Sequence, residues 1–145
     1  HEVTAIDVSR PAISKLQYLA AQERITVDAK VADILDYDFK ETHDLIIAHG
    51  CLHLISQSER DAVIAHMQRN TTSGGYNIVA VFTDRLPVPE DIAPYAVGIF
   101  YEGEIKEAYS DWIIAYYESV TTNDEHPGGI KHSHAGNKLV AQKPQ

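Results

Sequence analysis

Two histidines near the end of the chain are spaced so that they can act together. His132 and His134 are two positions apart in a segment that we expect to be a strand, so their side chains share one face. Imidazoles paired in this way could act as acid or base at neutral pH, polarise an oxyanion or, with nearby His126, bind zinc. Histidines on a solvent-facing surface fit the same spacing, and that alternative stays open. We take His132 and His134 as candidate catalytic residues.

A second group combines two histidines with the only cysteine. His49, Cys51 and His53 form a His-x-Cys-x-His pattern, which could bind a metal or supply a nucleophile. We favour a loop that lines a substrate pocket, and Cys51 by itself is typical of a small buried apolar residue. The sequence contains no Ser-His-Asp nucleophile elbow and no Walker phosphate loop. We therefore predict no metal site and keep His53 as a candidate catalytic residue.

The elements that must position these residues alternate between strand and helix in the first part of the chain. Residues 3–7 form an apolar run typical of a strand, and Ser9 with Pro11 predicts the start of a helix that ends at about Glu23. The next elements are a strand at 25–32, an acidic loop at 33–39, a buried strand at 44–48, a helix capped by Ser56 or Ser58, a turn at 72–75 and a strand at 76–83.

The pattern changes in the second part of the chain. Three prolines predict a loop over residues 85–95, followed by a short helix at 103–109 and a strand at 112–120. A loop over 121–129, which contains Pro127, Gly128 and Gly129, then leads to a strand at 130–142. The two last strands predict an antiparallel hairpin at one edge of the sheet. The fold class is therefore α/β, mostly parallel, in a single domain over residues 1–145.

Length and composition exclude several classes of function. A chain of 145 residues, 44% hydrophobic and 23% charged, can bury a core of its own. No apolar run is long enough to span a membrane and no secretory signal precedes the first strand, so we expect a cytoplasmic protein without a membrane partner. A single cysteine excludes an internal disulfide. The net charge of −9 and the lack of a Lys/Arg cluster argue against a nucleic-acid partner.

In their order, these elements resemble the second half of a class I S-adenosylmethionine-dependent methyltransferase, which has a Rossmann-like sheet. Residues 66–77 (HMQRNTTSGGYN) resemble the helix, Pro-Gly-Gly turn and fifth strand of the tellurite-resistance (TehB-type) methyltransferases, the most similar branch. Residues 100–105 (FYEGEI) and 109–112 (YSDW) match the segment before that family's sixth strand. The resemblance implies methyl transfer from S-adenosylmethionine to a small soft nucleophile or oxyanion. An acceptor proton could pass to His132 or His134.

The resemblance also implies which residues hold the cofactor. Asp7, at the end of the first strand, would accept hydrogen bonds from the ribose hydroxyls, and Asp33 and Ile34 would lie beside the adenine. His49 and Gly50 would flank the sulfonium, and the residues that follow them, up to His53, would face the substrate. A helix-capping role for Asp7 and a plain loop role for Asp33 remain the alternatives.

The chain departs from the family at its start. The family's first strand and its Gly-rich loop, which cradles the methionine part of the cofactor, are absent from this sequence. That strand would lie between the strands at 3–7 and 44–48, so we expect both to present unpaired edges. We therefore expect this chain to bind S-adenosylmethionine weakly or not at all, and to form a homodimer whose interface covers or fills the gap. The alternative to an enzyme is a truncated, non-catalytic module that is stable only as a homo-oligomer.

Overall fold

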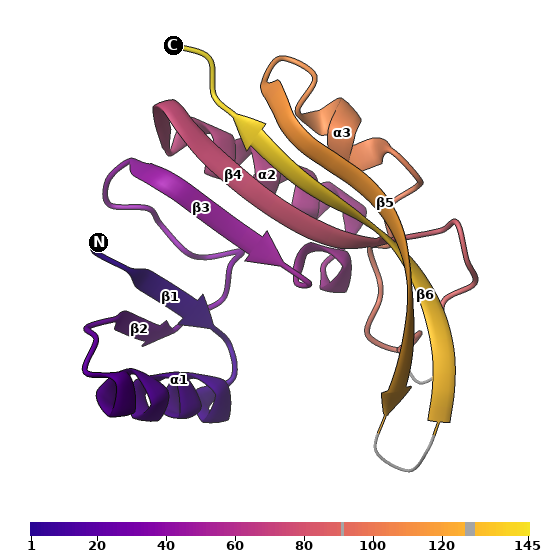
Figure 1. Ribbon diagram of the computed structural model, residues 1–145, viewed down its shortest axis with the longest axis horizontal. Helices are drawn as coiled ribbons and strands as arrows, with labels where there is room; N and C mark the ends of the chain where they lie inside the picture. The colour runs from indigo at the N-terminus through magenta and orange to yellow at the C-terminus, as the bar shows by residue number, and fades with distance from the viewer. Residues whose placement is uncertain (91, 127–129) are drawn as a thin grey trace. The chain divides into compact units, whose positions relative to one another are not determined.

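The computed structural model describes residues 1–90, 92–126 and 130–145 (Figure 1). The chain divides into two compact units, His1–Lys40 and Glu41–Gln145, and each is described by itself. That residues 1–145 act as one domain stays a prediction. Among the described residues, no helix is both long and apolar enough to cross a membrane.

The first unit contains two parallel strands joined through a helix. Its elements are β1 (Thr4–Asp7), α1 (Arg10–Glu23) and β2 (Asp28–Val31). The helix begins where the Ser9 hydroxyl accepts a hydrogen bond from the Ala12 N–H at 3.3 Å, and it ends at Arg24, whose φ is 56°. Strand and helix lie where the sequence predicts them, but the second strand is shorter than residues 25–32.

The second unit is a four-stranded sheet with helices. Its elements in chain order are β3 (His43–His49), a 3-10 helix η1 (Leu52–Leu54), α2 (Gln57–Arg69), β4 (Thr71–Thr83), α3 (Glu104–Ala108), β5 (Ile113–His126) and β6 (Ile130–Gln142). The strand order is β3-β4-β6-β5, in which β3 and β4 are parallel and β6 is antiparallel to both of its neighbours. The predicted α/β fold with a C-terminal antiparallel hairpin is therefore confirmed. Residues 127–129, which join the hairpin strands, lie outside the described residues.

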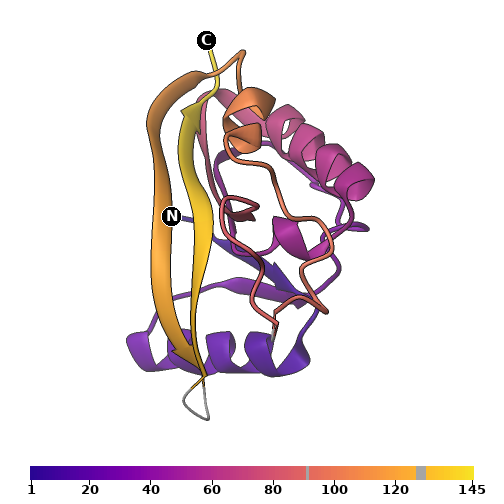
Figure 2. The same ribbon diagram turned by 90° about the vertical axis from the view of Figure 1, so that its right-hand side faces the viewer.

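Both helices of this unit cover the same side of the sheet, which we call the covered face (Figure 2). Alternate residues of the central strands point to this side and are buried, as the two-residue period of a strand requires. The strands contribute Ala48 of β3, Val79 and Val81 of β4, and Leu139 and Ala141 of β6 to the core. The helices contribute Val63, Ile64 and Met67 of α2, Ile105 of α3, and Tyr109, which directly follows α3. Ser56 starts α2 through a capping box with Glu59, as one of the two predicted caps.

The opposite side of the sheet, which we call the open face, carries exposed apolar side chains. Leu45 is 49% exposed, Ile47 59%, Tyr76 38% and Tyr116 48%. Leu45 and Ile47 belong to β3, which pairs only with β4 among the described strands. In the same way β1 pairs only with β2. Within each unit, the described strands thus leave one edge of β1 and one edge of β3 without a partner, as the sequence predicts.

Two sequence predictions about loops are wrong. Residues 72–75 are part of β4 rather than a turn before it, although the pairing jumps from His43 opposite Thr71 to Leu45 opposite Tyr76. The glycines serve this irregularity, because Gly74 has a φ of 77° and a Cβ on Gly75 would lie 2.9 Å from the Asp44 carbonyl oxygen.

Residues 121–126 form the second error, since they belong to β5 rather than to a loop. Their polar side chains suggested a loop, but they pair residue by residue with β6, with Thr122 opposite His134 and Asp124 opposite His132. A hairpin that projects beyond the core has two solvent-facing sides, so polar residues are compatible with a strand there.

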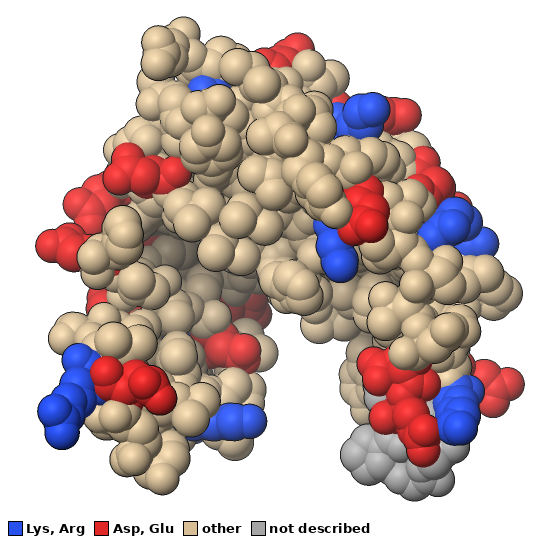
Figure 3. Space-filling view, in the orientation of Figure 1, with Lys and Arg blue, Asp and Glu red and all other residues tan. Residues whose placement is uncertain are grey.

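Acidic residues outnumber basic ones, and the net charge is −9. On the face shown in Figure 3, the Lys and Arg side chains lie in separate places instead of forming one patch.

Candidate active site

Two carboxylates meet at one edge of the sheet in residues 1–40. Asp7 is the last residue of β1, and Asp33 follows β2 by two positions. Because β1 and β2 are parallel neighbours, their carboxyl ends lie at the same edge. The Ala32 N–H donates to the Asp7 carbonyl oxygen at 3.1 Å, which ties the two strand ends together.

Each carboxylate makes a local hydrogen bond and keeps accepting capacity. Asp7 Oδ1 accepts from the Ser9 N–H at 2.7 Å, and Asp33 Oδ1 accepts from the Leu35 N–H at 2.9 Å. Both residues are exposed, and no hydrogen bond found between described residues uses the Oδ2 atom of either. A carboxylate can accept about four hydrogen bonds. The turn-forming role of each acid is therefore compatible with binding hydroxyl or amino groups of a ligand.

A hollow of about 480 Å³ adjoins Asp33. It is lined by Lys30, Ala32, Asp33, Asp36, Tyr37, Asp38 and Lys40. Both lysines are paired with acids, Lys30 with Asp28 at 2.6 Å and Lys40 with Asp38 at 2.7 Å. Ile34 is half-buried and is not among the lining residues. That Ile34 covers an adenine ring therefore stays a prediction.

In the larger unit, β3 ends at His49 and Gly50 turns the chain into η1. The φ of Gly50 is 73°, a conformation that favours glycine, and its N–H donates to the Ala80 carbonyl oxygen at 2.9 Å. His49 is exposed, Cys51 is half-buried, and His53 is buried with 3% of its surface exposed. The two histidines of the His-x-Cys-x-His pattern therefore differ in exposure, because His49 is open to solvent and His53 is buried.

His53 is held by β4 in one protonation state. Its Nδ1 accepts a hydrogen bond from the Phe82 N–H at 3.3 Å, so the proton of the neutral ring lies on Nε2. Burial, together with the charge of neighbouring His134, lowers the pKa of His53 to about 4. At neutral pH His53 is therefore an uncharged hydrogen-bond donor rather than a proton acceptor.

Three histidines and a phenylalanine form what we call the aromatic row. The His53 and Phe82 rings stack at a centroid distance of 4.2 Å and an interplanar angle of 21°, and Phe82 lies 4.3 Å from His134. The His134 and His132 centroids are 5.6 Å apart. The structure thus brings the three candidate catalytic histidines together, and the predicted common face of His132 and His134 is confirmed.

A hollow of about 270 Å³ lies along the open face beside this row, and we call it the sheet hollow. Its lining residues are His49, Gly50, Ala80, Val81, Phe82, Val120, Thr122, His134, Gly136, Asn137 and Lys138. The sheet hollow therefore joins His49 and Gly50, predicted for the cofactor, to His134, predicted for the substrate.

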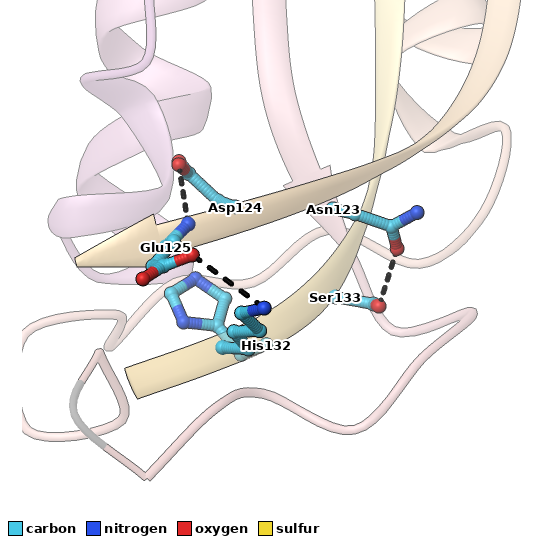
Figure 4. Close-up of a pocket in the computed structure, with 6 residues that line it drawn as sticks. Asn123, Asp124, Glu125, His132 and Ser133 are labelled. Carbon is cyan, nitrogen blue, oxygen red and sulfur yellow. Dashed lines mark hydrogen bonds and ion pairs between the residues drawn. The ribbon is translucent and has the colours of Figure 1, made fainter. Parts of the chain in front are cut away.

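His132 lines a different hollow, of about 530 Å³, near the end of the hairpin (Figure 4). Its neighbours there are Asn123, Asp124, Glu125, Lys131 and Ser133. Lys131 pairs with Glu125 at 3.8 Å, and the Ser133 hydroxyl donates to Asn123 Oδ1 at 2.7 Å. Of the two hairpin histidines, His134 is therefore the one placed at the sheet hollow.

Sequence reasoning missed two residues of this region. Phe82 was expected only as part of a strand, although its place two positions after Ala80 puts it on the same face. Lys138 could have been found from the same two-residue period, counted from His134 along the last strand. The zinc alternative that included His126 involves a side chain outside the described part. Within that part, no group of three or more His, Cys, Asp or Glu could hold a metal ion.

The sequence matches a family model over most of its length. The model of tellurite resistance protein TehB matches residues 1–138. The chain belongs to this family. It is 29% identical over 119 residues to the probable S-adenosyl-L-methionine-dependent methyltransferase TehB of Haemophilus influenzae (strain 10810), which covers 81% of this chain and 40% of the relative.

Solved structures show which fold the chain has. The crystal structure of TehB from Haemophilus influenzae superposes with a TM-score of 0.86 at 23% identity, over 99% of this chain and 50% of that chain. The N-methyltransferase NodS from Bradyrhizobium japonicum WM9 was solved in complex with S-adenosyl-L-homocysteine. It superposes with a TM-score of 0.68 at 15% identity, over 99% of this chain and 67% of that chain. The fold is that of a class I methyltransferase. The chain spans about 40% of the length of the curated TehB relative.

Proposed function

We propose that this TehB-family chain takes part in methyl transfer from S-adenosylmethionine to a small soft nucleophile or oxyanion. The observation that carries the proposal is the meeting of Asp7 and Asp33 at adjoining strand ends, in a chain that matches the TehB family over residues 1–138. Ligands of open α/β sheets bind at the carboxyl ends of the strands. The relatives named as S-adenosylmethionine-dependent methyltransferases support this choice of cofactor.

The donor set of the chain suits the polar parts of this cofactor. The Asp7 carboxylate would accept hydrogen bonds from the ribose hydroxyls, and Asp33 would accept from the adenine amino group, with Ile34 against the ring. His49 and Gly50 would lie near the sulfonium, where the exposed backbone of a glycine allows close approach. When bound, S-adenosylmethionine supplies an electrophilic methyl group.

The three histidines of the aromatic row would act on the methyl acceptor. The acceptor's lone pair forms the new bond to the methyl carbon while the carbon–sulfur bond breaks and its electrons stay on sulfur. Any acceptor proton passes to His134 or His132, and His53 contributes a fixed Nε2–H donor beside them. Holding the acceptor beside the row supplies much of the rate gain through effective concentration.

Titration of the ¹⁵N-labelled chain with S-adenosylhomocysteine, followed by NMR, tests the cofactor part of this proposal. We expect affinity in about the millimolar range, with shifts in the amides that follow β1 and β2. Asp7→Asn keeps an oxygen for the Ser9 N–H but loses the charge, and should weaken binding roughly tenfold. Glu23→Gln, an exposed acid at the end of α1 and outside the hollow, is the control. Unchanged affinity in Asp7→Asn would leave Asp7 a turn residue only.

We also propose that the chain forms a homodimer through its unpaired edges. The edge strand β3 presents free backbone positions next to exposed Leu45 and Ile47, and such edges template pairing with another chain. These edges favour the second candidate, a non-catalytic module stable as a homo-oligomer. Absence of any S-adenosylhomocysteine shifts, together with a dimer in sedimentation, would select that candidate over the enzyme.

A further inference from the structure

Arg60 of α2 places a positive charge inside the larger unit. Only 1% of its side chain is exposed. One guanidinium nitrogen donates to the carbonyl oxygens of Gly98 and Ile99, and another pairs with Glu104 at the start of α3. A buried charge costs stability unless several partners compensate it, so these contacts are kept. They hold residues 98–100, which we call the anchor segment, against α2.

The anchor segment contacts both the backbone and the ring support of His53. The Gly98 N–H donates to the His53 carbonyl oxygen at 3.1 Å. The Phe100 N–H donates to the Phe82 carbonyl oxygen at 3.2 Å, and the N–H of the same Phe82 is the donor to His53 Nδ1. The segment is thus joined to the backbone of His53 directly and to its imidazole through one residue of β4.

The anchor segment has little freedom to move. A Cβ on Gly98 would collide with the Ile55 carbonyl oxygen, so its backbone lies directly against the chain that follows η1. Glu104 is fixed as well, because its second carboxylate oxygen accepts from the Tyr101 N–H at 2.8 Å. In a packing this close, a shift of the segment is passed on to His53 instead of being absorbed.

Arginine suits this position better than lysine. Its planar guanidinium has five donors in fixed directions, so one group holds two carbonyl oxygens and a carboxylate at once. The Arg60 Cζ also lies 3.7 Å from the ring centroid of Phe100, which adds a cation–π contact with the anchor segment. All of these contacts are made inside the unit Glu41–Gln145, so they do not depend on any other part of the chain.

We propose that Arg60 is a positioning residue for His53. Through the anchor segment it holds the backbone and the ring of His53 so that Nδ1 accepts from Phe82 and the proton of the neutral ring stays on Nε2. Arg60 acts on His53 without touching a reacting group. Only the use of the Nε2–H donor in methyl transfer rests on the proposed function, and the orientation of the ring does not.

Ring ¹⁵N NMR of the chain without cofactor tests the proposal. In the parent, the His53 ring should carry its proton on Nε2 and keep a pKa of about 4. Arg60→Lys keeps the charge, but one ammonium cannot hold the carbonyls and the carboxylate together. We expect this variant to give the ring signals of a tautomer mixture and a His53 pKa raised toward its ordinary value of 6.5. His134, which neighbours His53 from β6, is titrated in the same spectra.

Two further variants separate positioning from a general loss of stability. Met67→Ala lies about two turns further along α2 and removes buried methylenes, so it should destabilise the protein to a similar degree while His53 keeps its parent signals. Gly98→Ala leaves Arg60 in place and displaces the anchor segment, so it should change the His53 ring signals in the way that Arg60→Lys does.

Parent-like His53 signals in Arg60→Lys would overturn the proposal. So would equal changes in Arg60→Lys and Met67→Ala, which would show that any loss of packing frees the ring. If Arg60→Lys does not fold, Gly98→Ala decides in its place, and parent-like signals there would overturn the proposal. Failure of the proposed function is read separately, from S-adenosylhomocysteine titration. A His53 ring that depends on Arg60 in a chain without cofactor binding would keep the positioning role and remove its part in methyl transfer.

Discussion

The covered and open faces of the four-stranded sheet use polar residues in opposite ways. On the covered face, Asn77 receives a hydrogen bond from the Thr71 hydroxyl at 2.8 Å and donates to the Tyr109 hydroxyl at 2.9 Å. Asn137 donates to Glu102 at 2.8 Å and accepts from the Gly103 N–H at 3.0 Å. On the open face, Lys138 and His49 are exposed beside a hollow.

This difference distinguishes polar residues that stabilise the fold from polar residues that can bind a ligand. A polar group buried under helices costs stability unless an internal partner satisfies it, so its partners are fixed. A polar group on a face that no described helix of this unit covers can keep its capacity for a ligand. Whether a layer covers the residue, rather than its chemical type, therefore decides which polar residues are candidates for function.

Arg60 gives the largest expected effect on the covered face. Its guanidinium is 1% exposed, pairs with Glu104, donates to the carbonyl oxygens of Gly98 and Ile99, and lies 3.7 Å from the Phe100 ring centroid. Arg60→Met should lower the free energy of unfolding by about 3 kcal/mol, because Glu104 and the carbonyls lose their partner. Chemical denaturation followed by the fluorescence of the only tryptophan, Trp112, measures this.

The matched control for Arg60 is the double variant Arg60→Met, Glu104→Gln. Removal of the second charge should restore part of the loss, since the unpaired carboxylate is no longer present. A loss below about 1 kcal/mol in the single variant would mean that the ion pair contributes as little as an exposed one.

His53 predicts a dependence of stability on pH. Its pKa is about 4 in the folded protein and near 6.5 when unfolded, so the unfolded state takes up the proton first as pH falls. Stability should fall by about 2–3 kcal/mol between pH 6.5 and 4 and gain no further slope from this residue below pH 4. Denaturation at several pH values should give a flatter profile for His53→Gln. Parallel profiles for parent and variant would contradict the buried neutral state.

Tyr109 tests the hydrogen bonds of the covered face without a charge. Tyr109→Phe removes the hydroxyl that accepts from Asn77 and leaves a buried amide N–H without that partner. We expect a loss of about 1–2 kcal/mol in the free energy of unfolding. Tyr95→Phe, at a position that is 70% exposed, is the control and should have no measurable effect. Equal effects of the two variants would show that burial does not set the cost.

The contrast between the faces also explains what could be predicted from sequence. The two-residue period placed His132 and His134 on one face, and strand ends placed Asp7 and Asp33 at one edge, because both follow from local geometry. The contact of His53 with Phe82, 29 positions apart in the chain, could not be predicted, since it depends on how β3 pairs with β4 and on the path of η1 after β3. For the same reason the sheet hollow, built by register between three strands, was not predicted.

The open face gives the smallest expected effect on stability and the clearest test of assembly. Ile47 is 59% exposed on the edge strand β3, so Ile47→Lys should change the free energy of unfolding by no more than about 0.5 kcal/mol. If two copies associate through this edge, the added lysine places like charges at the symmetric contact and opposes pairing, which is how natural edge strands avoid it. Sedimentation at micromolar concentration should therefore show a dimer for the parent and a monomer for Ile47→Lys.

The control for Ile47→Lys is Ile47→Thr, which keeps a branched side chain without a charge and should preserve the dimer. A dimer that survives in both variants would place the interface away from β3, and a monomeric parent would remove the homodimer proposal.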